Sequence, residues 1–200
     1  MMKVFASCQR EIEFRYGTRR ACARHFGFLA LHKFGWFHQL EQIDWPRVNR
    51  LIFVCQGNIC RSPYAESRAR AQGLNVTSFG LEADGRSSPD PTARKVAQQR
   101  GIVLDGMISR PAQQCELRAG DLILAMEPTH AQQLESIIAR AAAAPQLTLL
   151  GLWKKPPRPY IPDPYGRRAE FFENCFDSID EAINSVAHRL VKSTAKERRP

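Results

Sequence analysis

A cysteine and an arginine separated by five residues stand in the segment LIFVCQGNICRSPYAES, residues 51–67. An apolar run ends at Cys55, and Gly57 and Asn58 follow it before Arg61. In a chain this rich in arginine such a pair arises by chance, so only its sequence context makes it informative. The context is a strand, then residue types that allow unusual backbone angles, then the start of a helix. We call residues 55–62 the anion loop.

The anion loop has the composition of a site for a tetrahedral oxyanion. Its backbone N–H groups can turn inward around one anion, and the N-terminus of the following helix adds partial positive charge. Arg61 supplies a planar fork that can bind two anion oxygens at once. These groups favour the thiolate form of Cys55, and Ser62 can donate a hydrogen bond to its sulfur. A thiolate beside a bound phosphate is a nucleophile for phosphoryl transfer.

A phosphoryl transfer also needs an acid for the leaving oxygen. The late segment IPDPYG holds Asp163 between two prolines, and Tyr165 follows it. Proline restricts the backbone, so a carboxyl group placed here can be aimed without a long helix. A plain Asp-Pro turn is the competing interpretation of this segment.

The elements that must position these residues alternate between strand-like and helix-like from residue 51 onward. Strands are expected at 50–54, 75–79, 121–126 and 146–153. Helices are expected at 63–72, 90–101, 128–144 and about 168–191. This order predicts an α/β domain with a parallel sheet covered by helices on both faces. Ligands bind such sheets at the carboxyl ends of the strands, which is where Cys55 stands.

Length and composition limit the class of protein. Two hundred residues with 44% hydrophobic content suit one globular domain with an appendage. No stretch approaches the ~18 uninterrupted apolar residues of a membrane helix, and the first residues lack the apolar core of a signal peptide. We therefore expect a soluble, cytoplasmic protein whose six cysteines are mostly reduced thiols.

Partners and metals are constrained by charge and by cysteine spacing. The net charge of +9 is interpreted as a solvated basic surface, with attraction of anionic substrates or anionic membrane surfaces as an alternative. No basic run is interleaved with aromatic residues, so no nucleic-acid partner is expected. Neither a CxxC pair nor a Cys/His cluster has the spacing of zinc ligands, so no metal is expected.

The chain divides into a domain at residues 49–192, an extension at 1–48 and a charged tail at 193–200 that is expected to fray. The extension is rich in arginine, histidine and aromatic residues and is centred on FGFLALHKFGWF. Three interpretations of it are open. It packs on the domain, it contacts a membrane surface or a partner protein as an amphipathic helix, or it is disordered upstream of the true start.

The segment VCQGNICRSP, together with the late DPYG, resembles the low-molecular-weight protein tyrosine phosphatase family in its bacterial form. The segments GLEADGRSSPDPTA, GIVLDGMISR and DLILAME follow in family order, so the resemblance runs from about residue 50 to 190. It implies a four-stranded parallel sheet flanked by helices on both faces, a phosphatase I-like doubly wound fold. It also implies hydrolysis of phosphotyrosine through a phosphocysteine intermediate, without metal or cofactor.

The resemblance assigns roles to three residues. Cys55 would be the nucleophile, Arg61 the phosphate clamp and stabiliser of the transition state, and Asp163 the general acid and then the general base. Cys60 matches a second loop cysteine that can form a reversible disulfide with the nucleophile under peroxide. The residues expected to bind the substrate are Gln56, Gly57, Asn58, Ile59, Cys60, Ser62 and Tyr165.

The sequence departs from the family at two places near the site. Gly106 and Met107 stand where many members carry a histidine, which puts part of the supporting hydrogen-bond network in doubt. The loop at residues 82–84 is acidic where many members carry an aromatic residue, which puts substrate preference in doubt.

Other functions remain open on the same fold. Arsenate reduction needs relay cysteines, and only Cys115 lies in a plausible region. A phosphoarginine phosphatase would be expected to carry threonine where this chain has Ile59. A non-catalytic phosphopeptide-binding module is the alternative of another class. By family analogy the partner is a tyrosine-phosphorylated protein, with a bacterial tyrosine kinase that controls exopolysaccharide as the candidate.

Overall fold

The computed structural model describes residues 11–197, with side chains through residue 193. Its centre is a four-stranded, all-parallel sheet in the order β2-β1-β3-β4. The strands are β1 (Arg50–Cys55), β2 (Val76–Gly80), β3 (Asp121–Ala125) and β4 (Gln146–Leu149). This arrangement confirms the predicted fold. It puts β1, which ends in Cys55, in the interior of the sheet.

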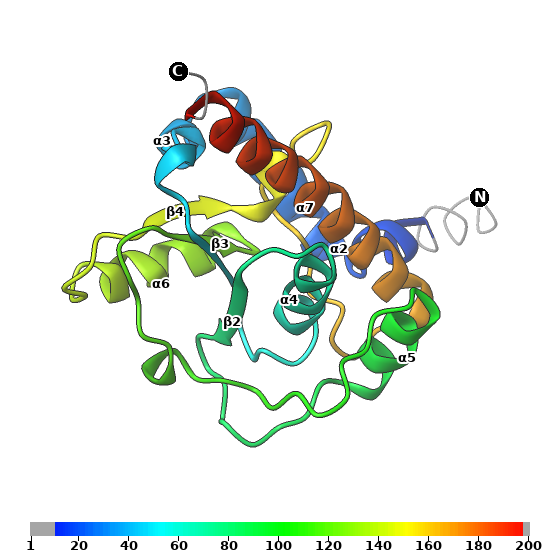
Figure 1. Cartoon of the computed structure of the whole chain (residues 1–200). Coiled ribbons are helices and arrows are strands. Elements are labelled where there is room, and N and C mark those ends of the chain that lie inside the picture. The colour runs from blue at the N-terminus through cyan, green and yellow to red at the C-terminus, as the bar shows by residue number, and fades with distance from the viewer. Residues whose placement is uncertain (1–10, 198–200) are drawn as a thin grey trace.

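Helices cover both faces of the sheet (Figure 1). Helices α4 (Arg61–Ala71), α5 (Pro91–Gln99) and α7 (Ala169–Glu197) share one buried cluster with Leu51 and Phe53 of β1. Helix α6 (Pro128–Ile138) shares the other cluster with Ile52 and Val54. Successive β1 side chains thus enter opposite cores, which is why this strand is a continuous apolar run.

The N-terminal extension is folded over its described residues. A short helix covers residues 11–16, and α2 (Arg19–Lys33), α3 (His38–Glu41) and the 3₁₀ helix η1 (Trp45–Arg47) follow it. Phe37 is 5% exposed within the cluster that α6 covers, and Phe28 and Leu40 pack against that cluster. Packing on the domain is therefore correct for residues 11–48, and disorder is not. The division of the chain at residue 48 stays a prediction.

Three predicted element ends differ from the structure by more than two residues. α6 ends at Ile138 rather than at residue 144, because the alanines that follow have little apolar surface to bury and Pro145 disfavours helix before it. β4 ends at Leu149, and η3 (Leu150–Trp153) replaces its second half. The third difference is α7, whose backbone continues to Glu197, beyond the predicted end at residue 191.

The chain turns back toward the carboxyl end of the sheet after the early end of β4. Gly151 leaves room for a returning loop, since a Cβ at this position would lie 1.9 Å from Arg158 O. Arg158 N donates to Gly151 O at 2.8 Å. This close crossing turns the chain back toward the carboxyl end of the sheet and places residues 160–168, which we call the acid loop, there.

None of the helices in the described part of the chain has the length and apolar character needed to cross a membrane.

Candidate active site

The anion loop starts where β1 ends and is packed against the neighbouring strand. Cys55 is 3% exposed and pairs in register with Gly80, the last residue of β2. A Cβ on Gly80 would lie 2.7 Å from both Asn58 N and Gln56 O. Glycine at this position therefore lets the loop cross over β2, and no larger residue fits without moving its backbone.

Asn58 fixes the turn of the anion loop from inside. Its φ of 53° is in the left-handed region, which costs a non-glycine residue about 1–3 kcal/mol and is tolerated best by asparagine. Its Nδ2 donates to Ser62 Oγ and to Ser78 Oγ, both at 2.8 Å, and its Oδ1 accepts from Arg110 N at 2.8 Å. Ser62 Oγ lies 3.0 Å from Cys55 Sγ. The loop is thus held rigid by buried hydrogen bonds that end at the sulfur.

The network that supports Asn58 continues without the histidine expected from the family pattern. Ser78 Oγ donates to the buried Glu66 carboxylate at 2.5 Å, and Arg70 pairs with the same carboxylate. Met107, near the expected histidine, instead accepts a hydrogen bond at its sulfur from Ser67 Oγ at 3.3 Å. Glu66 therefore closes the network from α4.

The acidic loop at residues 82–84 is tied to the scaffold through Asp84. Its carboxylate accepts from Ser87 Oγ at 2.6 Å, from Ser109 Oγ at 2.7 Å and from the backbone of Arg86 at 2.9 Å. The Ser87 and Ser109 hydrogen bonds hold the pKa of Asp84 well below its usual range. Asp84 is therefore an ionised structural group and a poor candidate for a general acid.

Arg61 is the most enclosed charge of the site, with 1% of its surface exposed. Its Nη1 donates to Glu127 Oε1 and to Ile161 O, both at 2.9 Å, and its Nη2 lies 2.8 Å from Asp163 Oδ2. Burial disfavours the charge, but Asp163 and Glu127 outweigh it and raise the pKa of Arg61. Its Nε is buried with no hydrogen-bond partner among the described residues. The guanidinium is thus a fixed cation with a donor still to satisfy.

Asp163 reaches Arg61 from an exposed loop. Its side chain is 45% exposed, and its Oδ1 accepts from Tyr165 N at 3.2 Å. The base of the acid loop is attached to the sheet, because Ile161 N donates to Met126 O at 3.0 Å directly after β3. Tyr165 is 61% exposed at the rim. The loop therefore has a fixed base and a solvent-exposed tip.

Two further thiols lie buried around the loops. Burial, followed by the negative charge of Asp163, raises the pKa of Cys60 far above that of a free thiol. Burial raises the pKa of Cys175 to about 12, and its Sγ donates to Pro162 O at 3.7 Å. Both are therefore protonated thiols near neutral pH.

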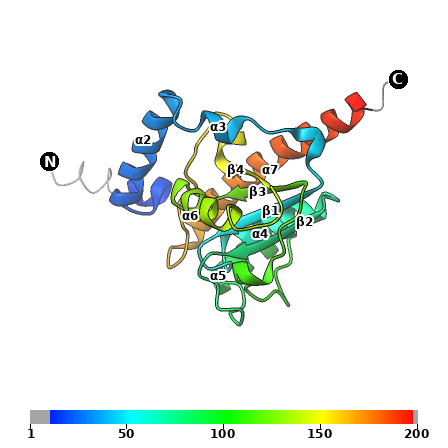
Figure 2. The same ribbon diagram turned by 90° about the vertical axis from the view of Figure 1, so that its left-hand side faces the viewer.

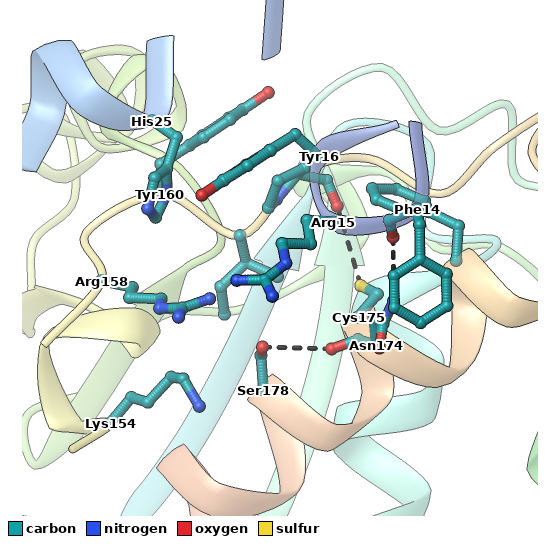
Figure 3. A pocket seen from close by; sticks show the side chains of 13 residues that line it. Phe14, Arg15, Tyr16, His25, Lys154, Arg158, Tyr160, Asn174, Cys175 and Ser178 are labelled. Carbon is teal, nitrogen blue, oxygen red and sulfur yellow. Dashed lines mark hydrogen bonds between the residues drawn. The ribbon is translucent and has the colours of Figure 1, made fainter. Parts of the chain in front are cut away.

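A cavity of about 320 Å³ lies behind the acid loop, on the side of the extension. Its lining, drawn in Figure 3, includes Tyr16 and His25 of the extension together with Tyr160, Arg158 and Lys154. Cys175 forms part of its wall on α7. The extension and the acid loop thus meet here around an open space rather than in a closed core.

The remaining predicted site residues contribute mainly through their backbone. Gln56 O accepts from Glu82 N at 2.8 Å, and Ile59 O accepts from Asp90 N at 2.9 Å. The residues that the sequence-based prediction missed as parts of the site are Ser78, Arg110, Glu66, the carbonyl group of Ile161 and, as a partner of Arg61, Glu127. Only Glu127 had a usable signal, since it directly follows the strand expected at residues 121–126. Among the described residues no group of three or more His, Cys, Asp or Glu side chains is placed to hold a metal ion.

Comparison with known proteins gives a consistent result. The family model described as low molecular weight phosphotyrosine protein phosphatase matches residues 50–197. The low molecular weight protein-tyrosine-phosphatase Etp of Escherichia coli (strain K12) is 35% identical over 146 residues, which cover 72% of this chain and 96% of Etp.

Solved structures agree in fold. The Vibrio vulnificus Wzb structure in complex with benzylphosphonate has a TM-score of 0.62 and 30% identity, and the match covers 72% of this chain and 99% of that one. The YwlE arginine phosphatase from Geobacillus stearothermophilus has a TM-score of 0.65, with 76% of this chain and 99% of that one covered. Its identity of 23% limits that likeness to the fold.

Proposed function

The chain belongs to the low molecular weight phosphotyrosine protein phosphatase family, and we propose that it hydrolyses phosphotyrosine on proteins through a phosphocysteine at Cys55. The observation that carries the proposal is the convergence on one edge of the sheet of a buried thiol, a buried guanidinium and an exposed carboxyl group. These are a nucleophile, an anion clamp and an acid, which together suffice for transfer of a phosphoryl group.

In the first step Cys55 Sγ attacks phosphorus and the bond from phosphorus to the tyrosine oxygen breaks. Asp163 gives its proton to the leaving phenolic oxygen. In the second step water attacks the phosphocysteine, Asp163 accepts the proton of that water, and the S–P bond breaks. The products are inorganic phosphate and the Cys55 thiolate, which Ser62 stabilises by hydrogen bonding.

Arg61 stabilises the equatorial oxygens of the transferring group in both steps. Its Nε is the free donor, while its Nη2 is engaged by Asp163 in this structure. Binding of the phosphate group therefore displaces the Asp163 carboxyl group from Nη2 and frees it to face the leaving oxygen. Glu127 and Ile161 O hold Nη1 throughout, so the guanidinium keeps its orientation.

The proposed substrate is a tyrosine-phosphorylated protein, and a tyrosine kinase is the candidate partner because relatives such as Etp are named tyrosine phosphatases. The cytoplasm is the proposed compartment, since a thiol nucleophile must stay reduced to work. The extension offers a contact surface for a partner protein or a membrane. Among its described residues the exposed large hydrophobic side chains are Phe14 at 50%, Phe26 at 56%, Phe34 at 88% and Trp36 at 71%.

Turnover of matched peptides tests the proposal. The same peptide sequence is offered with phosphotyrosine or phosphoarginine, arsenate reduction is measured in parallel with a thiol reductant, and Cys55→Ser is the control. We expect phosphotyrosine to be hydrolysed fastest, Cys55→Ser to be inactive, and EDTA to have no effect. Faster hydrolysis of phosphoarginine, reduction of arsenate, or peptide binding without turnover would each replace the proposal by one of its alternatives.

A further inference from the structure

Both oxygens of the Glu127 carboxylate are engaged by arginines, one from the domain and one from the extension. Arg61 Nη1 donates to Glu127 Oε1 at 2.9 Å, and Arg24 Nη2 donates to Glu127 Oε2 at 3.1 Å. Glu127 is only 7% exposed, so little solvent competes for either oxygen. From this bridge we propose that Arg24 is a positioning residue for Arg61 and acts through Glu127. The proposal rests on the function proposed above.

Arg24 is itself held in place by the packing of the extension. Its guanidinium lies 5.0 Å from the centre of the Tyr160 ring and 5.9 Å from that of Phe28, and its Nη2 donates to Thr129 Oγ1 at 3.5 Å. These contacts place α2 beside the start of α6 (Figure 2). The helix carrying Arg24 starts at a cap in which Ala21 N donates to Thr18 Oγ1 at 2.9 Å. The guanidinium therefore approaches Glu127 from a defined direction.

Arg24 contacts one support of Arg61 directly and the residue next to the other. One support is Glu127, and the other is the carbonyl group of Ile161, the residue after Tyr160, on whose ring Arg24 stacks. Burial is the largest single influence on Glu127 and acts to raise its pKa, but the charge and hydrogen bond of Arg61, together with His130 and Arg24, outweigh it and lower the pKa of Glu127. Burial and Arg61 lower the pKa of the adjacent His130 to about 4, so His130 is neutral near pH 7. Arg24 and Arg61 are thus the two lasting cations on this carboxylate.

Removal of Arg24 leaves Glu127 Oε2 with a single long hydrogen bond, from Thr129 Oγ1 at 3.4 Å, and without a cation. Such a group regains a partner by turning, and the nearest cation is Arg61. A Glu127 that turns onto Arg61 with both oxygens draws the guanidinium away from the anion loop and competes with the phosphate for its donors. Arg24 prevents this by satisfying the second oxygen. The family model matches residues 50–197, so this support comes from outside the part of the chain that defines the family.

The test is a double-mutant cycle on aryl phosphate turnover and on inhibition by orthovanadate. Arg24→Gln should lower kcat and weaken vanadate inhibition, each by roughly 3- to 30-fold, which lies within the range of coupling between contacting residues. In a Glu127→Gln background the same substitution should have little further effect. Arg24→Lys should restore part of the loss, because it keeps the cation near Oε2. Arg20→Gln, on the exposed side of the same helix, is the matched control and should match wild type.

Thermal unfolding measured on each variant separates positioning from docking. If Arg24→Gln lowers Tm while kcat and vanadate inhibition stay at wild-type values, Arg24 only attaches the extension and the proposal is wrong. If Arg24→Gln lowers kcat by the same factor in the wild-type and the Glu127→Gln proteins, Arg24 does not act through Glu127. An inactive wild-type protein would instead overturn the proposed phosphatase function, so the two failures are distinguishable.

Discussion

The anion loop and the acid loop are held in opposite ways although they meet at one guanidinium. In the anion loop Cys55, Asn58 and Ser62 are buried and joined by hydrogen bonds. In the acid loop Asp163 and Tyr165 are 45% and 61% exposed, and the tip is tied to the site by one ion pair to Arg61. The comparison indicates that charge stabilisation is built in before the substrate arrives, whereas proton transfer is left to a group that can move.

The position of the Arg61–Asp163 ion pair explains this division. A buried guanidinium that keeps Glu127 and Ile161 O as partners stays in place when one neighbour leaves. A carboxyl group that is almost half exposed loses little when it exchanges an ion pair for solvent or for a substrate oxygen. Variants of the two loops should therefore respond differently to the chemistry of the leaving group.

Asp163→Asn should give the largest loss among variants that keep the nucleophile. We expect phosphotyrosine hydrolysis to slow by roughly 10²–10⁴-fold, the usual contribution of a positioned general acid. The loss should shrink for aryl phosphates with acidic leaving groups, because these need little protonation. It should not vanish, because attack of water on the phosphocysteine still needs a base. The kcat/KM values for a series of substituted phenyl phosphates measure this dependence.

Asp105→Asn is a matched control on an exposed, loosely paired carboxylate and should leave the series unchanged. If Asp163→Asn costs the same factor for every leaving group, Asp163 is not the acid. The search would then turn to Glu82, since Asp84 is fully engaged by hydrogen-bond donors.

Arg61→Lys tests the anion loop. An ammonium group cannot supply the bidentate fork, so we expect kcat/KM to fall by roughly 10²–10³-fold, comparable to removal of a transition-state hydrogen-bond donor. In contrast to Asp163→Asn, the loss should be similar across the same series of phenyl phosphates. If the loss instead depended on the acidity of the leaving group, Arg61 would also act in leaving-group protonation, and the two loops would not have separate roles. Circular dichroism and Tm of the variant control for its folding, because Arg61 is buried.

Cys60→Ser should change recovery from oxidation more than turnover. The raised pKa of Cys60 keeps its thiol protonated, so peroxide should oxidise Cys55 first. The thiol of Cys60 should then react with the sulfenic acid on Cys55 to form a disulfide. We expect dithiothreitol to restore the wild-type enzyme, and several-fold less activity to return in the variant. Equal recovery of both proteins would assign Cys60 to packing alone.

The smallest effect on activity is expected from a variant in the extension that backs the acid loop, where the change is in stability. Burial, aided by Arg158, lowers the pKa of His25 from 6.5 to about 4. The unfolded chain then binds more protons between these values, so His25 leaves stability unaffected above pH 6.5 and costs stability as pH falls toward 4. His25→Gln should remove up to about 3 kcal/mol of the acid-induced loss. Urea unfolding at pH 7.5 and 4.5 measures it, with His188→Gln as the exposed control.

The sequence predicted the parts of the site that are contiguous in the chain. A strand, a loop and a helix start within residues 50–71, so local patterns indicated the anion loop directly, and the prolines around Asp163 marked the acid loop. The partners Ser78 and Arg110, from distant segments, could not be predicted, because they are ordinary polar residues until the sheet brings them to Asn58. The contact between Arg24 and Glu127 depends on how the extension packs on the domain, and the pattern of apolar residues in the sequence does not predict that packing.

The central claim is that phosphate passes through Cys55, and the direct measurement is rapid acid quenching during turnover of an aryl phosphate, followed by peptide mass spectrometry. We predict a phosphorylated peptide containing Cys55 that forms and decays at rates consistent with kcat. Cys55→Ser should show no turnover and no adduct that forms within the turnover time. Wild-type turnover with no adduct on Cys55, or with a kinetically competent phosphate on another residue, would contradict the account.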